Sequence, residues 1–88
     1  MITTTKIHSI LKAAGVEKSV SVKNGKIKGM NDKLPGYRVY KFDFNKTIEI
    51  DFFRSTATMI EKTQTALDAA SITYTRNGNE FVIKMVQG

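Results

Sequence analysis

With 88 residues, the chain has room for one domain, residues 1–88, and its 41% hydrophobic and 25% charged residues are typical of a folded globular protein. The net charge is +6, and the excess lies in the first half: residues 1–41 carry nine Lys and Arg against two Asp and Glu, whereas residues 42–88 carry five against six. The absence of cysteine excludes disulfides and cysteine-based zinc sites, and no segment offers the ~20 apolar residues that span a bilayer, so we expect a cytoplasmic protein without membrane association.

The first expected element is a helix over residues 6–14. Its apolar residues are spaced i, i+3, i+4, i+7, which places them on one helical face: Ile7, Ile10, Leu11 and Ala14. Thr4 or Thr5 can cap its start, and Gly15 suits the left-handed residue after its end.

A hairpin around Asn24-Gly25 is expected next, with strands over residues 20–23 and 26–28. Lys23 would then lie opposite Lys26, so the hairpin either frays or is stabilised by an anion that relieves the repulsion. Residues 29–36 collect turn formers and the only proline, which predicts a loop.

Two alternating segments, residues 37–44 and 47–53, predict an aromatic hairpin at the centre of the sheet, with Tyr40, Phe42 and Phe44 facing the core. A two-residue loop at 45–46 would place Phe42 opposite Glu49. A three-residue loop at 45–47 instead pairs Phe44 with Ile48, Phe42 with Ile50 and Tyr40 with Phe52. We favour the longer loop, because the register of a strand follows its buried face.

A second helix follows, with Ser55 as a candidate N-cap and Thr58 to Glu61 as a possible capping box. Its weak apolar face consists of Ile60, Thr63, Leu67 and Ala70. The chain ends in a hairpin around Asn77-Gly78, which would pair Tyr74 with Phe81 and Ile72 with Ile83. The expected fold is α+β, in the order α-ββ-ββ-α-ββ, with two helices on one face of a mainly antiparallel sheet of about five to six strands.

The basic residues of the first half, with two interleaved tyrosines, form the main candidate site. Several ammonium groups on one hairpin and the following strand could converge on phosphates, while exposed tyrosines could stack on bases. The alternative is a solvated, Lys-rich sheet edge that blocks aggregation. The candidate nucleic-acid-binding residues are Lys23, Lys26, Lys28, Lys33, Arg38, Lys41, Tyr37 and Tyr40.

Three further features are also considered. Met30 and Leu34 are apolar residues in a predicted loop, and they either contact a partner or fold back onto the core. Asp43, Glu49 and Asp51 are expected on the outer face of the central hairpin, Asp43 opposite Glu49 and Lys41 opposite Asp51. We interpret them as an exposed face with an ion pair rather than a Mg²⁺ or Ca²⁺ site. His8, the only histidine, is expected at the surface or boundary.

No nucleophile with a base, no multidentate metal set and no phosphate-binding glycine loop is visible, so we expect neither an enzyme nor a cofactor.

Leu11 to Gly15, Pro35 to Val39 and Ala66 to Gly78 together give the chain a resemblance to small uncharacterised proteins of bacteriophage genomes. The resemblance implies a free-standing accessory protein that blocks a host nucleic-acid or defence machine, and it assigns no functional residue.

Two hypotheses follow. The first is a non-enzymatic module whose Lys-rich first half contacts nucleic acid or a nucleoprotein. The second is a phage-type protein that inhibits a host or defence protein by direct contact, through residues 29–36 and the adjoining strands. A homodimer through a sheet edge or bare sheet face is also compatible with this sequence, since two small helices leave much of a large sheet uncovered.

Overall fold

The computed structural model describes residues 1–20, 22–23 and 35–87. Along the chain these form α1 (Thr4–Ala13), a short 3₁₀ helix η1 (Glu17–Ser19), β1 (Val22–Lys23), β2 (Gly36–Phe42), β3 (Thr47–Phe53), α2 (Ala57–Ala69), β4 (Tyr74–Asn77) and β5 (Glu80–Lys84). The chain is therefore α+β, as its sequence predicts.

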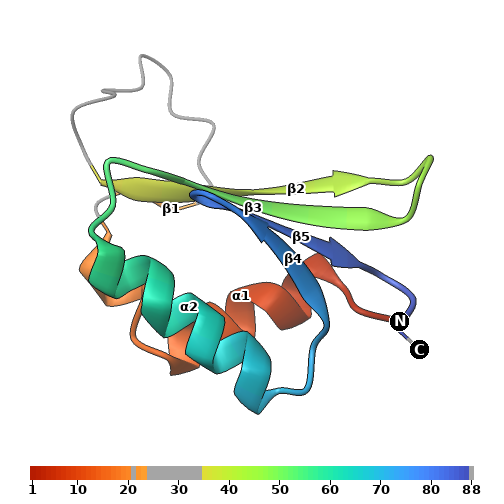
Figure 1. Cartoon of the computed structure of the whole chain (residues 1–88), viewed down its shortest axis with the longest axis horizontal. Helices are drawn as coiled ribbons and strands as arrows, with labels where there is room; N and C mark the ends of the chain where they lie inside the picture. The colour runs from red at the N-terminus through yellow and green to blue at the C-terminus, as the bar shows by residue number, and fades with distance from the viewer. Residues whose placement is uncertain (21, 24–34, 88) are drawn as a thin grey trace.

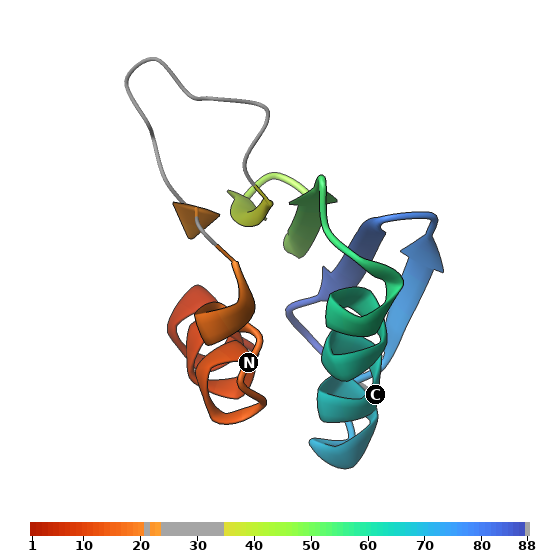
Figure 2. The same cartoon turned by 90° about the vertical axis from the view of Figure 1, so that its left-hand side faces the viewer.

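The strands form one sheet in the order β1-β2-β3-β5-β4, and both helices pack on the same side of it (Figures 1 and 2). Strands β2, β3, β5 and β4 are antiparallel, whereas β1 pairs with β2 in parallel, through Val22–Gly36 and Lys23–Tyr37. The predicted strand order is therefore not matched. A parallel pair needs a connection of about a dozen residues, which the stretch 24–35 provides. The predicted Asn24-Gly25 turn lies outside the described residues.

Helix α1 begins two residues earlier than predicted. Oγ1 of Thr3 accepts a hydrogen bond from the backbone N–H of Lys6 at 3.1 Å, so Thr3, rather than Thr4 or Thr5, is the N-cap. After the helix, Gly15 has a φ of 78°, the left-handed conformation predicted for it.

The predicted start of α2 is also wrong. Thr56 is the N-cap, and its Oγ1 accepts from the N–H of Met59 at 3.4 Å. Ser55 instead donates its hydroxyl to the carbonyl of Gly36 at 3.1 Å, which ties the end of β3 to the start of β2. The box from Thr58 to Glu61 lies inside the helix, so it caps nothing.

The register of the central hairpin differs from both predicted alternatives. Phe42 pairs with Thr47, so a four-residue turn, residues 43–46, connects β2 to β3. Relative to the favoured register, each β3 residue meets a β2 partner three positions earlier, and an odd shift exchanges the two faces of a strand. Tyr37 and Val39 therefore face the core, whereas Tyr40 and Phe42 point away from it.

The last hairpin forms, but its predicted register is wrong by two residues, because Tyr74 pairs with Ile83 and not with Phe81. Asn77 pairs with Glu80 around a Gly78–Asn79 turn, and Gly78 has a φ of 61°. An even shift preserves the faces, so the rings of Tyr74 and Phe81 still meet, with their centroids 5.4 Å apart.

The core lies between the helices and the inner face of the sheet. It joins Ile7 and Leu11 of α1 to Ile60 and Leu67 of α2, all of which are buried. From the strands it takes alternate side chains: Tyr37, Ile48, Ile50, Phe52, Phe81 and Ile83. With the helices on this side, the opposite face of the sheet has no described helix over it (Figure 1).

Candidate binding surface on the sheet

The surface of interest is the face of the sheet opposite the helices, which we name the outer face. Successive side chains of a strand alternate between the two faces, so the buried residues identify the outer ones. The outer face consists of Arg38, Tyr40 and Phe42 of β2, Thr47, Glu49, Asp51 and Phe53 of β3, and Glu80, Val82 and Lys84 of β5.

A row of three aromatic rings follows β2 into the turn. Tyr40 and Phe42 are half-buried and nearly parallel, with ring centroids 6.2 Å apart. Phe42 and Phe44 meet edge to face at 6.0 Å, and Phe44 is 85% exposed. A large, almost fully exposed apolar side chain beside two others marks a contact surface. We name Tyr40, Phe42 and Phe44 the aromatic row.

Arg38 lies at the end of the aromatic row that is farther from the β2–β3 turn, and it contacts two aromatic side chains. Its Nη1 donates to the hydroxyl oxygen of Tyr40 at 3.4 Å, and its guanidinium carbon lies 5.4 Å from the ring centroid of Phe53. Across the strand pair it faces Asp51. The planar guanidinium is therefore oriented before any ligand arrives.

A hollow of about 540 Å³ opens beside Arg38. Its outer-face lining consists of Arg38, Tyr40, Asp51, Phe53 and Glu80, completed by Phe52, Arg54 and Asn79. Arg54 has a φ of 49°, a left-handed conformation that is uncommon for a residue other than glycine. Such strain tends to concentrate at functional sites. The hollow therefore combines two aromatic side chains, Tyr40 and Phe53, with both hydrogen-bond donors and acceptors.

Three carboxylates meet at the centre of the outer face. Oxygen atoms of Glu49, Asp51 and Glu80 lie within 4.8 Å of one another. Partial burial raises the pKa of Asp51 from 3.8 to about 6, helped by the charge and hydrogen bond of Glu80 and by the charge of Glu49, while Arg38 acts in the opposite direction. These residues are the group among the described residues that could hold a cation, but the guanidinium opposite Asp51 opposes one.

The structure corrects the predicted acidic group. Asp43 lies in the turn, where its carboxylate is 3.4 Å from Nζ of Lys41, so neither the predicted Asp43–Glu49 pair nor the Lys41–Asp51 pair forms. The third carboxylate of the group is Glu80 instead of Asp43. Glu80 lies on β5, which pairs with β3 along the edge opposite β2. The alternation of Glu80, Val82 and Lys84 was a signal for this face, but only the strand order brings Glu80 beside Asp51.

The predicted nucleic-acid-binding residues are only partly brought together. Arg38 and Tyr40 share the outer face, and Lys41 is exposed near the turn. Tyr37 is 0% exposed and faces the core, so its ring is not available to stack on a base. Lys23 belongs to β1. The other predicted contacts, Lys26, Lys28, Lys33, Met30 and Leu34, lie outside the described residues.

Tyr37 and His8 instead belong to the helix side of the sheet. Their ring centroids are 6.1 Å apart, and His8 is half-buried, at the boundary that the sequence predicts. Burial, with a smaller contribution from the charge of Glu17, raises the pKa of Tyr37 to about 12. This tyrosine is a core residue.

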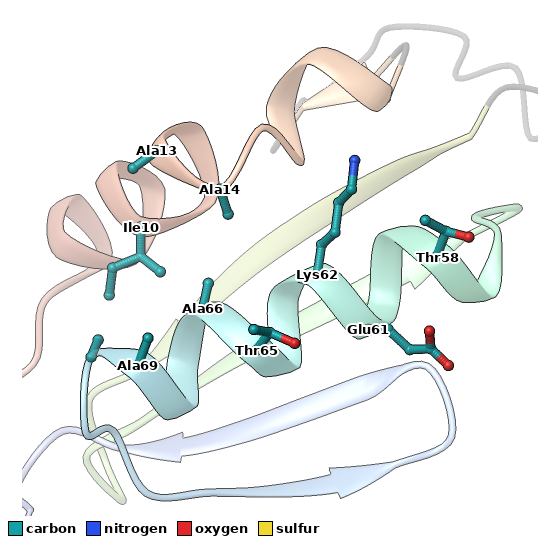
Figure 3. Close-up of a pocket in the computed structure, with 10 residues that line it drawn as sticks. Ile10, Ala13, Ala14, Thr58, Glu61, Lys62, Thr65, Ala66 and Ala69 are labelled. Carbon is teal, nitrogen blue, oxygen red and sulfur yellow. The ribbon is translucent and has the colours of Figure 1, made fainter.

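A second concavity, a groove of about 720 Å³, runs between α1 and α2. Figure 3 shows Ile10 of α1 and its C-cap residue Ala14 pointing toward α2, Ala66 of α2 pointing toward α1, and Lys62 extending from α2. Half of its lining residues are alanines, and the polar ones, Thr58, Glu61, Lys62 and Thr65, all lie on α2. The groove is therefore apolar on the α1 side and carries polar side chains on the α2 side only.

Comparison with known proteins found no matching family model, curated protein or solved structure. Among the described residues, neither helix has the length and apolar character required to cross a membrane.

Proposed function

We propose that the protein is a non-enzymatic module that binds single-stranded nucleic acid on the outer face of its sheet. The aromatic row is the observation that carries this proposal. Every base has a π face, and stacking on an aromatic side chain contributes about 1–3 kcal/mol per base, largely independent of sequence.

The spacing of the row favours a single strand over a duplex. The ring centroids of Tyr40 and Phe42, whose planes differ by 28°, are 6.2 Å apart, whereas bases stacked in one strand of a duplex rise by roughly 3.4 Å. Bases lying on successive rings would therefore be separated from one another. A single strand reaches this arrangement without breaking base pairs, which a duplex must do.

The charges support a defined path for the strand. Lys84 and Lys46 are exposed at the turn end of the outer face, and Arg54 is exposed at the other end, while the carboxylates occupy the centre. Phosphates of the strand would then contact the lysines and the arginine at the two ends of the outer face, and the bases would lie between these ends. The nine basic residues of positions 1–41 would add long-range attraction for the polyanion.

Fluorescence anisotropy with labelled single-stranded and duplex DNA and RNA, at 50 and 200 mM salt, tests this function. The expected result is tighter binding of single strands that weakens steeply with salt. Phe42→Leu keeps an apolar side chain but removes the π face, so it should reduce affinity about tenfold, within the range for one stacked base. Absence of binding at the lower salt concentration would reject the function.

A matched pair of lysine variants separates the outer face from general attraction. Lys84→Gln removes an exposed cation of the outer face, whereas Lys62→Gln removes an exposed cation from α2. If Lys84 contacts a phosphate, its variant should reduce the salt slope by about 0.7 and the Lys62 variant should not. Equal effects of the two would contradict binding on the outer face.

The carboxylate centre favours a second candidate, a phage-type inhibitor that docks a basic segment of a host protein. Glu49, Asp51 and Glu80 face outward beside an apolar row, which suits an arginine-rich partner surface. A complex isolated after complete nuclease digestion, and lost in the triple variant Glu49→Gln, Asp51→Asn, Glu80→Gln, would support this candidate. Loss of the partner on nuclease treatment would favour the nucleic-acid function.

A further inference from the structure

The hollow is lined by both hydrogen-bond donors and acceptors, and this combination restricts which ligands can bind there. Asp51 and Glu80 supply carboxylate acceptors from adjacent strands, and Arg38 supplies donors from the third. Tyr40 belongs both to the hollow and to the aromatic row, so a strand laid along the row leads into it. A ligand there must donate to the carboxylates and accept from the guanidinium.

Guanine is the nucleobase whose edges match this set. Its N1–H and 2-amino group are adjacent donors suited to carboxylates, and its O6 and N7 accept from arginine. Adenine and cytosine place a ring acceptor beside their amino group, and thymine flanks its single N–H with two carbonyl oxygens. Each of these bases would point at least one acceptor at a carboxylate oxygen. Two acceptors that face each other form no hydrogen bond, so the affinity for that base is lower.

We propose that the hollow is a guanine subsite, in which Asp51 and Glu80 accept hydrogen bonds from N1–H and the 2-amino group while Arg38 donates to O6 and N7. This inference rests on the proposed function, because it assigns the base that follows those stacked on the aromatic row. Arg38 is already oriented by Tyr40 and Phe53, which lowers the entropic cost of fixing its side chain.

The test compares four DNA octamers that share a thymidine background, in lithium buffer to prevent quadruplexes. One contains thymidine alone; the others contain two isolated guanosines, two inosines or two cytidines. Inosine keeps O6, N7 and N1–H but lacks the 2-amino group. The guanosine octamer should bind about tenfold more tightly than the thymidine octamer, and inosine should lose most of that gain, as expected for one bidentate contact.

Glu80→Gln identifies the acceptor, because glutamine has nearly the same shape but replaces one acceptor oxygen by a donor. It should abolish the guanosine preference, measured as the ratio of guanosine to thymidine affinity, because loss of a negative charge strengthens attraction for every oligonucleotide alike. Glu61→Gln makes the same charge change on α2, on the other side of the sheet, and should keep the preference. Circular dichroism of both variants would verify that they remain folded.

Acid provides a second readout that does not require a variant. Burial, together with Glu80 and Glu49, raises the pKa of Asp51 to about 6, although the charge of Arg38 acts in the opposite direction. Below that pH the carboxyl takes up a proton and becomes a hydrogen-bond donor. The ratio of guanosine to thymidine affinity should therefore decrease between pH 7.5 and pH 5. The ratio is the informative quantity, since acid strengthens attraction for every oligonucleotide alike.

The outcomes distinguish this inference from the function beneath it. Equal affinities for guanosine, inosine and thymidine octamers would overturn the guanine subsite and leave single-strand binding standing. A guanosine preference that survives Glu80→Gln would also overturn it. No binding of any octamer at 50 mM salt would overturn the proposed function and the subsite together.

Discussion

Replacing Asp51 with asparagine should raise the free energy of unfolding at neutral pH. The carboxyl is half-buried on the outer face, and its buried Oδ1 has no hydrogen-bond partner among the described residues. Burial, together with the nearby charges of Glu80 and Glu49, destabilises its ionised form more than Arg38 stabilises it. Asparagine has nearly the same shape and removes that charge.

The magnitude follows from the pKa of Asp51, which rises from 3.8 to about 6. A difference of this size corresponds to about 3 kcal/mol if the native environment acts at full strength. Asp51 and its carboxylate neighbours lie at a solvent-facing surface, where screening weakens such interactions, so we expect about 1 kcal/mol.

The pH dependence has a definite sign. Because the pKa of this acid is higher in the native state, the native protein binds a proton that the unfolded chain lacks between about pH 4 and pH 6. Stability contributed by Asp51 therefore increases as pH falls through this window. The stabilisation by Asp51→Asn should be present at pH 7 and should disappear near pH 4.

Urea unfolding followed by circular dichroism at pH 7.0 and pH 4.0 measures both quantities. Asp43→Asn is the matched control, because this aspartate is exposed in the β2–β3 turn and should alter stability little at either pH. If Asp51→Asn is destabilising at pH 7, the attraction between Asp51 and Arg38 outweighs the repulsion, and our description of the outer-face charges is wrong.

Two further changes test the helix side of the sheet by the same urea assay. Tyr37→Phe removes a buried hydroxyl that has no hydrogen-bond partner among the described residues. The free energy of unfolding should therefore stay the same or rise by about 1 kcal/mol. A decrease of more than about 1 kcal/mol would show that the hydroxyl does form a hydrogen bond. Gly15→Ala should cost about 1 kcal/mol through its φ of 78° alone, since an added Cβ would meet no described atom beyond its own chain neighbours within 4 Å. An unchanged midpoint would contradict this backbone strain.

Local patterns in the sequence predict the helices well. The spacing of Ile7 and Leu11, and of Ile60 and Leu67, places each pair on one helical face, and all four are buried. Gly15 ends α1 in the predicted conformation. The helix starts are less certain from sequence, because several threonines near each start can act as caps and the sequence does not select between them.

The faces of β2 could not be predicted from composition. The favoured register assumed that the strand's more aromatic face, with Tyr40 and Phe42, is the buried one. Instead, Tyr37 and Val39 pack against the helix layer, which leaves the aromatic face outward. The same assumption hid part of the aromatic row: Tyr40 was a candidate for stacking, but Phe42 and Phe44 were expected only in the core.

The outer-face hollow depends on strand order, which local patterns do not encode. Glu80 lies 29 positions from Asp51 in sequence but on the adjacent strand, because β5 inserts between β3 and β4. Arg38 joins them through the β2–β3 pairing. The sequence therefore identified Arg38 and Tyr40 as candidates while missing the acidic partner across the sheet.

The central claim, that the outer face binds single-stranded nucleic acid, is tested most directly by mapping the contact in solution. Adding a single-stranded octamer to isotope-labelled protein while recording amide and aromatic resonances locates the bound strand. We predict that the perturbed resonances belong to Arg38, Tyr40, Phe42, Phe44 and Val82, with those of α1 and α2 unchanged. Perturbations confined to the helices, or none at saturating oligonucleotide, would contradict the claim.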